Sequence, residues 1–222
     1  LQMRKSSPPT IAHNVAIFKT YHAGIAPEHA APYRLVPIMD RAHIARKLNR
    51  PVVLAGLMGA GKTTVGRRLA ERLGWPFADS DHEVEAAAGR SVSDIFADFG
   101  EAAFRDGERK VIARLLEEPR PSIIALGGGA FIQDATRALI KTCAVSVWLD
   151  ADIDTLMERV GRRDTRPLLQ TDDPRAVMEK LMAERAPVYA QADIHIRSRG
   201  MPHDASVSAI IEALADRVEA AG

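Results

Sequence analysis

The amino-acid sequence predicts a three-layer α/β fold, with a central parallel sheet of about five strands and helices on both of its faces. Short apolar runs rich in β-branched residues alternate along the chain with longer segments whose apolar residues recur at helical spacing. Glycine or proline punctuates most of the junctions between them. Strands that alternate with helices are joined by crossover connections, which produce a parallel sheet covered on both faces.

The five expected strands are short apolar runs, and the third ends in three consecutive glycines. They occupy residues 51–57, 75–81, 122–129, 144–150 and 193–198. The expected helices carry apolar residues three or four positions apart. They occupy residues 62–74, 83–89, 91–118, 134–142, 153–161, 173–192 and 204–221.

Two of the helices have clear end signals. In the first, Val65, Leu69 and Leu73 recur at helical spacing and Gly74 closes the segment. The long helix at 91–118 begins with Ser91 or Ser93, either of which can cap its first turn. We expect three apolar side chains of that helix to point inward: Ile95, Phe96 and Phe99.

Composition narrows the classes of partner. The 222 residues carry a net charge of +1, which gives no global field for nucleic acid or an anionic membrane. No stretch approaches the ~20 apolar residues of a membrane span. Cys143 is the single cysteine, which excludes an internal disulfide and fits a reducing compartment. We therefore expect a cytoplasmic monomer that uses neither nucleic acid nor membrane as a partner.

Residues 1–48 differ from the rest of the chain. They contain seven Lys/Arg against two Asp/Glu, four of the seven histidines and five prolines. No helical or strand period persists there, although 39–48 could form a short helix. We interpret 1–48 as a poorly specified N-terminal extension and 49–222 as the functional domain. We also expect the functional protein to begin near Met39.

A phosphate-binding motif follows the first expected strand. Residues 56–63 fit the pattern G-x-x-x-x-G-K-[ST] between an apolar strand and an amphipathic helix, which is the context that the motif requires. Its backbone N–H groups and the helix N-terminus suit phosphate oxygens. Lys62 suits the β- and γ-phosphates, and Thr63 suits Mg²⁺. The predicted ATP-binding residues here are Gly59, Ala60, Gly61, Lys62, Thr63 and Thr64.

Two aspartates follow the second expected strand. In open α/β sheets ligands bind beyond the carboxyl ends of the strands, so Asp79 and Asp81 should face the phosphate-binding loop. Alternate residues of an extended segment point the same way, which would place both carboxylates on one face while Ser80 points away. Phosphoryl transfer needs a carboxylate near Mg²⁺ and another near the attacking hydroxyl, and this strand end could supply both.

Six segments resemble, in order and spacing, the motifs of shikimate kinases. They are GLMGAGKTTVGRRLA (56–70), DSD (79–81), GEAAFRDGE (100–108), ALGGGA (125–130), RPLL (166–169) and ERAPVY (184–189). The resemblance covers roughly residues 50–215, and the combination is far more specific than a P-loop alone. It implies a nucleoside-monophosphate-kinase-like P-loop fold, with acceptor-binding helices at 81–114 and a lid at 159–169.

The resemblance also implies an activity: transfer of the γ-phosphate of ATP to the 3-hydroxyl of shikimate, with Mg²⁺. Asp79 then resembles the residue that holds Mg²⁺ through water, and Asp81 the residue that binds the hydroxyls of shikimate as a candidate base. Lys62 and Arg166 would neutralise the transferring phosphate. Arg159 resembles an arginine placed over the adenine.

Further positions match the shikimate-binding residues of the family. Arg105 and Arg185 resemble two arginines that bind the carboxylate, a geometry that planar guanidinium groups favour. Glu108 would be a hydroxyl partner or would orient its neighbours. The three glycines would let the backbone lie against the ring of the substrate; they are Gly127, Gly128 and Gly129. Adenine contacts around 197–204 match no firm motif.

Three alternatives remain at this point. A kinase for gluconate or for a nucleoside monophosphate would keep the P-loop, but should lack the set formed by Asp81, Arg105, the triple glycine and Arg185. A regulatory module would keep the fold and lose a catalytic position, whereas every such position is present in this sequence. A nucleic-acid role through the basic N-terminal segment would need interleaved aromatic residues or a recognisable module, and the segment shows neither.

Overall fold

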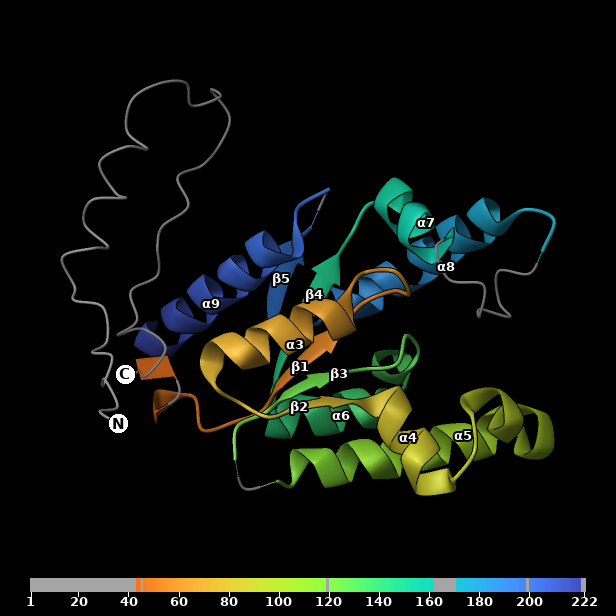
Figure 1. The fold of residues 1–222 in the computed structure, drawn as a ribbon, viewed down its shortest axis with the longest axis horizontal. Coiled ribbons are helices and arrows are strands. Elements are labelled where there is room, and N and C mark those ends of the chain that lie inside the picture. The colour runs from red at the N-terminus through yellow and green to blue at the C-terminus, as the bar shows by residue number, and fades with distance from the viewer. Residues whose placement is uncertain (1–42, 45, 119, 162–170, 199, 221–222) are drawn as a thin grey trace, which may run out of the picture. The chain divides into compact units, whose positions relative to one another are not determined.

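A computed structural model describes residues 43–220, with the exception of 45, 119, 162–170 and 199. Five strands form one sheet in these residues, and every pairing is parallel (Figure 1). The strand order is β2–β3–β1–β4–β5. Their bounds are Val52–Ala55 for β1, Phe77–Asp79 for β2, Ile123–Ala125 for β3, Val145–Asp150 for β4 and Ile194–Arg197 for β5. The predicted parallel sheet is confirmed.

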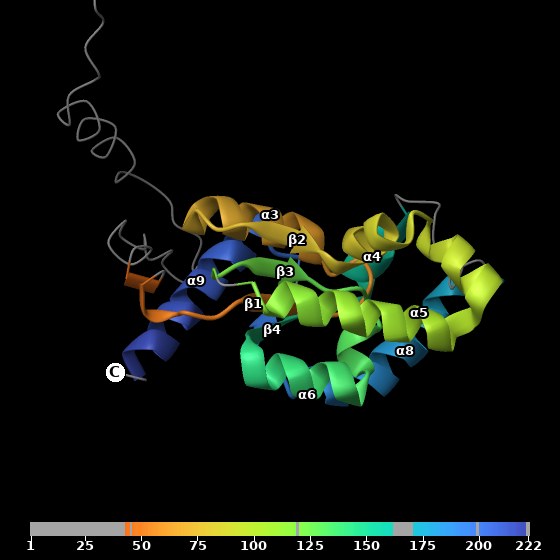
Figure 2. The ribbon, with the colours of Figure 1, turned by 90° about the horizontal axis from the view of Figure 1, so that it is seen from below.

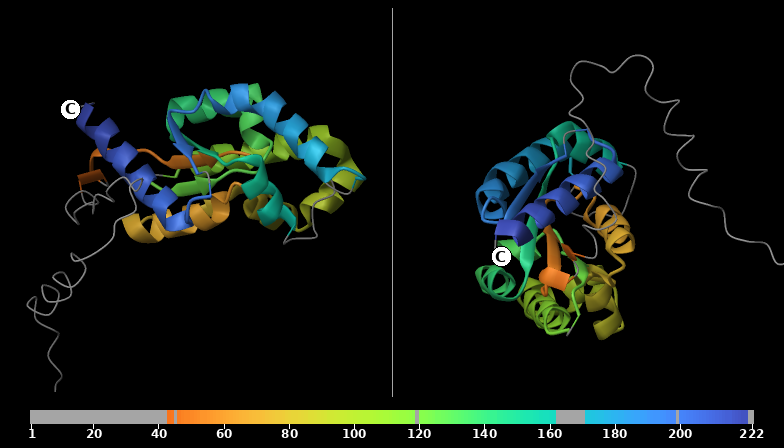
Figure 3. Two further views of the ribbon diagram at one scale, coloured as in Figure 1. Left: turned by 90° about the horizontal axis from the view of Figure 1, so that it is seen from above. Right: turned by 90° about the vertical axis from the view of Figure 1, so that its left-hand side faces the viewer.

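Helices lie on both faces of the sheet, as predicted. The helices are α3 (Lys62–Leu73), α4 (Ser80–Ala88), α5 (Val92–Leu116), α6 (Asp134–Cys143), α7 (Ile153–Gly161), α8 (Pro174–Tyr189) and α9 (His203–Ala220), with a 3₁₀ turn at Ala130–Ile132. Figures 2 and 3 show α3 and α9 on one face and α6 and α8 on the other. None of the helices in the described part of the chain is long and apolar enough to cross a bilayer.

The core is centred on the inner strands of the sheet, β3, β1 and β4. Val53, Leu54 and Val147 are fully buried between the helical layers. Near-continuous apolar strands of this kind are what a sheet covered on both faces requires. Removing this apolar surface from water stabilises the fold by roughly 25 cal/mol for each Å² buried.

The chain just before β1 also contributes to this core. Residues 43, 44, 46 and 47 are helical, within the 39–48 segment for which a short helix was expected. Ile44 is fully buried and Leu48 nearly so, and both belong to the main apolar cluster. The last residues of the predicted extension therefore pack with the domain. The expected start near Met39 lies outside the described residues.

Strand register sets the position of the functional loops. Asp79 of β2 is paired with Ala125 of β3, and Leu54 of β1 is paired with the same Ala125 on the other side. The three strands therefore end at one level, and the segments that follow them meet at the same edge of the sheet. These segments are the phosphate-binding motif, the start of α4 and the triple glycine.

The first helix follows its sequence signals closely. Val65, Leu69 and Leu73 are buried, and Gly74 ends the helix in a left-handed conformation at φ 70°. Glycine adopts this backbone conformation without the steric penalty of a Cβ, which makes it a common helix terminator.

The long helix departs from the prediction in two respects. Ser91 caps it as expected, accepting a hydrogen bond from the Asp94 N–H, but Gly100 interrupts it with φ 77° and ψ 173°. The prediction that Phe99 points inward was wrong, because this ring is 60% exposed. Ile95 is buried, and Phe96 packs on Phe104 with ring centroids 4.5 Å apart. The break at Gly100 changes the helical phase, so the face buried before it does not continue after it.

Candidate active site

A cavity of about 280 Å³ lies at the carboxyl ends of the strands. It is lined by Met58, Gly59, Gly61, Lys62, Thr63, Thr64, Asp79, Asp81, Leu126, Gly128, Arg159 and His203. The lining brings together residues from five parts of the chain. They are the phosphate-binding motif, the β2–α4 junction, the triple-glycine segment, α7 and α9. Nine of the lining residues were predicted from the sequence as site residues.

The Lys62 side chain is held over the phosphate-binding loop. Its ammonium group donates hydrogen bonds to the carbonyl oxygens of Gly56 and Leu57, at 2.9 and 3.0 Å. Gly61, just before it, has φ 91°, a conformation that favours glycine. The lysine charge and the N-terminus of α3 therefore lie at the same wall of the cavity, which suits a polyphosphate.

Thr63 and Asp79 form a pair of oxygen ligands on adjoining elements. The Thr63 hydroxyl donates to Asp79 Oδ2 at 2.7 Å. A hydroxyl and one carboxylate are a suitable protein contribution to a Mg²⁺ site, because this ion takes most of its remaining ligands from water and phosphate. The described residues hold no cluster of three or more His, Cys, Asp or Glu that could bind a metal without such help.

The two aspartates reach the cavity by a different route from the one predicted. β2 ends at Asp79, and Ser80 already begins α4, so strand alternation does not place Asp81. Asp79 caps this helix, since its carboxylate accepts a hydrogen bond from the Asp81 N–H at 3.2 Å. Asp81 lies in the first turn of α4, where a negative charge is favoured by the helix dipole. Asp79 and Asp81 therefore both lie at the cavity, as expected, but a helix cap rather than strand alternation places them there.

Arg105 and Glu108 form an ion pair on α5, one helical turn apart. Arg105 Nη1 donates to Glu108 Oε2 at 2.8 Å, and its guanidinium also lies 3.3 Å from Glu101 Oε1. The Glu108 side chain is 2% exposed, and its Oε1 has no hydrogen-bond partner among the described residues. Burial raises the pKa of Glu108, and the Arg105 hydrogen bond opposes this shift. An incoming hydroxyl could satisfy Oε1.

The glycines of the 127–129 segment make room for these charged side chains. A Cβ on Gly127 would lie 2.3 Å from Asp81 Oδ1 and 2.9 Å from Glu108 Oε1. A Cβ on Gly129 would lie 2.6 Å from Arg105 Nη2. Glycine at both positions lets the acidic and basic groups approach the β3 backbone, a physical reason that the sequence did not reveal.

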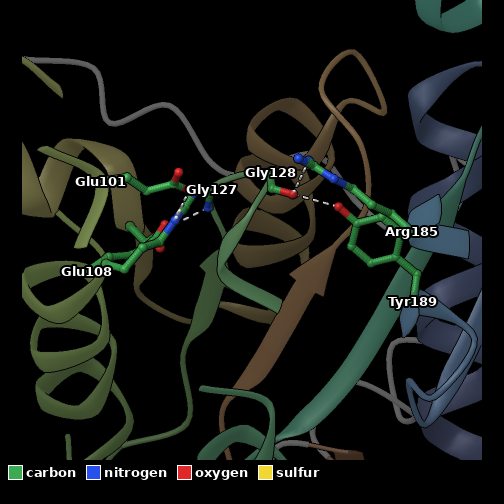
Figure 4. Close-up of polar contacts among 8 residues, drawn as sticks. Glu101, Glu108, Gly127, Gly128, Arg185 and Tyr189 are labelled. Atoms are coloured by element: carbon green, nitrogen blue, oxygen red, sulfur yellow. Dashed lines mark hydrogen bonds and ion pairs between the residues drawn. The ribbon is translucent and has the colours of Figure 1, made fainter. Parts of the chain in front are cut away.

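The middle glycine is held from the opposite side. The Gly128 carbonyl accepts hydrogen bonds from Arg185 Nη1 at 3.2 Å and from the Tyr189 hydroxyl at 2.6 Å, both on α8 (Figure 4). Tyr189 is almost fully buried, and burial raises the pKa of its hydroxyl to about 12, so it remains a donor at neutral pH. Arg105 and Arg185 thus flank one glycine segment from α5 and α8.

Two arginines, Arg159 and Arg166, were predicted for the nucleotide side of the cavity. Arg159 Nη1 lies 3.4 Å from the carbonyl oxygen of Ala60, which places the guanidinium against the phosphate-binding loop. Arg166 and most of the expected lid, 159–169, lie outside the described residues.

Comparison with known proteins identifies the family. The family model described as shikimate kinase matches residues 58–215. The chain belongs to the shikimate kinase family. A shikimate kinase of Caulobacter vibrioides is 58% identical over 165 residues, 74% of this chain and 82% of the relative. Another, of Novosphingobium aromaticivorans, is 51% identical over 190 residues, 84% of this chain and 97% of the relative.

Solved structures agree with the shikimate kinase assignment. A shikimate kinase from Acinetobacter baumannii in complex with shikimate has a TM-score of 0.72 at 35% identity, covering 81% of this chain and 98% of that chain. The shikimate kinase from Aquifex aeolicus has a TM-score of 0.64 at 31% identity, covering 75% of this chain and 97% of that one. The predicted P-loop kinase fold is therefore confirmed.

Three side chains of this shikimate kinase family member were not recognised as site residues from the sequence. The Ser80 hydroxyl accepts a hydrogen bond from the Gly127 N–H at 2.8 Å, so it fixes the glycine segment rather than pointing away from the site. Tyr189 binds the Gly128 carbonyl, and His203 lines the cavity. Ser80 lies within the DSD motif and Tyr189 within the ERAPVY motif, so the sequence indicated the right segments but not these two side chains. Nothing in the sequence singled out His203.

Proposed function

We propose that this chain transfers the γ-phosphoryl group of ATP to the 3-hydroxyl of shikimate, giving ADP and shikimate 3-phosphate. One observation carries the proposal: the residues that suit ATP and the residues that suit shikimate lie together at one edge of the sheet. The phosphate-binding loop lies beside Asp81 and Gly128 in one cavity, and Arg105 and Arg185 flank the glycine segment. Membership of the shikimate kinase family supports this substrate and a place in aromatic amino-acid biosynthesis.

Catalysis in this proposal is positioning and charge neutralisation, as expected for phosphoryl transfer. Asp81 accepts a hydrogen bond from the 3-hydroxyl and takes its proton as the oxygen attacks the γ-phosphorus. The bond from that phosphorus to the β-γ bridging oxygen breaks, and ADP leaves. Lys62 neutralises charge on the transferring group, and we assign the same role to Arg166. Arg159 lies on the side of the adenine.

Acceptor recognition is assigned to the groups around the triple glycine. Arg105 and Arg185 bind the carboxylate of shikimate, because two guanidinium groups fix both the charge and the orientation of an anion. Glu108 orients Arg105 and offers its buried Oε1 to a hydroxyl of the ring. Gly127, Gly128 and Gly129 allow the ring to approach the backbone.

A Mg²⁺ ion is the metal that the Thr63–Asp79 pair fits best. The pair supplies hard oxygen atoms beside the phosphate-binding loop, and the hydroxyl–carboxylate hydrogen bond of 2.7 Å holds both groups in place. When bound, Mg²⁺ supplies neutralisation of charge on the β- and γ-phosphates. A cytoplasmic location and a monomeric state stay predictions from composition.

The proposed function is tested by ADP release over a panel of acceptors: shikimate, quinate, gluconate and nucleoside monophosphates. Shikimate should give turnover well above the others. Turnover with gluconate or a nucleoside monophosphate alone would favour a related small-molecule kinase. ATP binding without turnover on any acceptor would favour a binding module, although the catalytic positions are present in the sequence.

Replacing Arg105 with alanine should weaken shikimate binding far more than ATP binding. A hydrogen bond to a charged group contributes on the order of 2–3 kcal/mol, which corresponds to a rise in the shikimate Kd of roughly 30-fold or more. Calorimetric titration of each ligand separates the two affinities.

The matched control for this experiment is Arg109→Ala, one turn further along α5. Arg109 pairs with Asp106 at the exposed surface, at 2.7 Å. This variant should leave both affinities unchanged. An equal loss of shikimate and ATP affinity in Arg105→Ala would contradict the assigned role and indicate general disruption.

Thr63→Ala should raise the Mg²⁺ concentration required for half-maximal activity. The variant loses the hydroxyl ligand and leaves Asp79 without the hydrogen bond that fixes it. Titration of the activity with Mg²⁺ at fixed ATP measures the effect. Thr142→Ala, which removes a hydroxyl at the exposed end of α6, is the control. An unchanged Mg²⁺ titration would remove Thr63 from the metal site.

A further inference from the structure

His203 is a cavity residue that the roles assigned above leave unexplained. It is the first residue of α9 and lines the same cavity as the phosphate-binding loop. Its ring packs directly on that loop, since a Cβ on Gly61 would lie 3.0 Å from His203 Nε2 and 3.2 Å from Cδ2. The same position would lie 3.4 Å from Arg159 Nη1. His203 and Arg159 thus share one contact point on the loop.

The sheet order indicates which part of a bound nucleotide lies there. Asp81 and Gly128 follow β2 and β3, on one side of β1, whereas Arg159 and His203 follow β4 and β5, on the other side. The phosphate-binding loop follows β1, between the two groups. Because the γ-phosphate must face the acceptor beside Asp81, the α-phosphate and the nucleoside must extend toward Arg159 and His203.

The charged groups around His203 suit an anion. Arg159 on α7 and Arg68 on α3 face it, and Asp204 lies next to it on α9. Asp204 is itself engaged by Arg68, at 3.1 Å. Burial lowers the pKa of His203, and so do Arg159 and Arg68, while Asp204 opposes them. A phosphate that arrives here meets a ring nitrogen in a field of net positive charge.

We propose that His203 binds the nucleotide by donating a ring N–H hydrogen bond to an α-phosphate oxygen, beside Arg159. This inference rests on the proposed use of ATP and adds a residue that sets nucleotide affinity. The contact leaves the γ-phosphate untouched, so His203 is a positioning residue for the donor and takes no part in the transfer itself.

The test is nucleotide binding by calorimetry without acceptor, comparing the parent chain with His203→Ala. The Kd values for ATP, ADP and AMP should all rise by the same factor, roughly tenfold for one hydrogen bond to a charged group. Adenosine should bind the two proteins equally. Shikimate affinity should not change, and this readout also shows that the variant is folded.

A conservative variant gives a second readout. His203→Gln keeps an N–H donor but cannot titrate, so it should recover most of the affinity lost in His203→Ala. Because the pKa of His203 is lowered, ADP affinity in the parent should increase as the pH falls below the ordinary titration range of histidine, where this ring takes up a proton. The increase should be smaller in the Gln variant. His82→Ala, at an exposed histidine of α4, is the matched control.

The outcomes separate this inference from the proposed function. Unchanged ADP and AMP affinities in His203→Ala would overturn it, and so would a loss seen with ATP alone or with adenosine. If the parent bound ADP but failed to phosphorylate shikimate, the proposed function would be contradicted. The role of His203 would still be decided by the binding of ATP, ADP, AMP and adenosine.

Discussion

Asp81→Asn is expected to abolish phosphoryl transfer to shikimate while ATP binding persists. The amide cannot take the proton of the 3-hydroxyl, and general-base catalysis contributes roughly 10²–10⁴-fold to a rate. The substitution preserves the shape of the side chain, and the backbone N–H of residue 81 still donates its hydrogen bond to the capping carboxylate of Asp79. Measured kcat should therefore fall by about this factor, with the Kd for ATP little changed.

Glu83→Gln is the matched control for this variant. Glu83 lies two residues further along α4, and its ion pair with Arg114 at 2.8 Å is at the surface, where such pairs contribute little. This control should keep the parent kcat. If Asp81→Asn retained most of its turnover, the carboxylate would only orient the hydroxyl. If it lost ATP binding as well, the separation between the donor and acceptor sides of the cavity would be wrong.

The chemistry of the site was predictable where residue type and spacing determine it. The phosphate-binding motif with its strand and helix gave the position of Lys62 and Thr63, and the end of the second strand indicated Asp79. Strand and helix periodicity likewise gave the parallel sheet and the buried face of α3. Each of these features is signalled by residue type and spacing within a single segment, even where the contacts themselves join distant parts of the chain.

Features that depend on distant contacts escaped the sequence. The burial of Ser80 reflects a hydrogen bond from Gly127, in the segment that follows β3, whereas Asp81 lies at the cavity through a local helix cap on Asp79 that strand alternation did not predict. Phe99 was predicted to point into the core, but it is the last residue before the break at Gly100 and its ring is exposed. His203 reaches the loop because β5 lies beside β4 in the sheet and α9, which follows β5, packs on α3, an arrangement that no local pattern encodes.

The largest structural effect is expected from Gly127→Ala, which adds a single methyl group. The backbone at this position permits alanine, because Gly127 is not among the positive-φ glycines. The space does not, since the new Cβ would lie 2.3 Å from Asp81 Oδ1 and 2.9 Å from Glu108 Oε1. Overpacking of this kind destabilises a protein by about 1–3 kcal/mol.

The methyl group should also displace Asp81 from its position beside the acceptor. Displacement of a reacting group by about 1 Å can lower a rate on the order of 10²-fold, so kcat/KM for shikimate should fall at least this far. ATP affinity should change little, because the phosphate-binding loop belongs to the neighbouring strand β1 and Gly127 does not line the cavity.

Gly107→Ala distinguishes this effect from the general consequences of replacing a glycine. Gly107 lies within α5, between Arg105 and Glu108, and a Cβ there would meet no atom within 4 Å. Alanine should therefore stabilise the helix by about 0.5–1 kcal/mol and leave the kinetics unchanged. Thermal unfolding and steady-state kinetics on both variants decide the matter. Parent-like kcat/KM in Gly127→Ala would mean that Asp81 can move without loss, and its role as the positioned base would then fail.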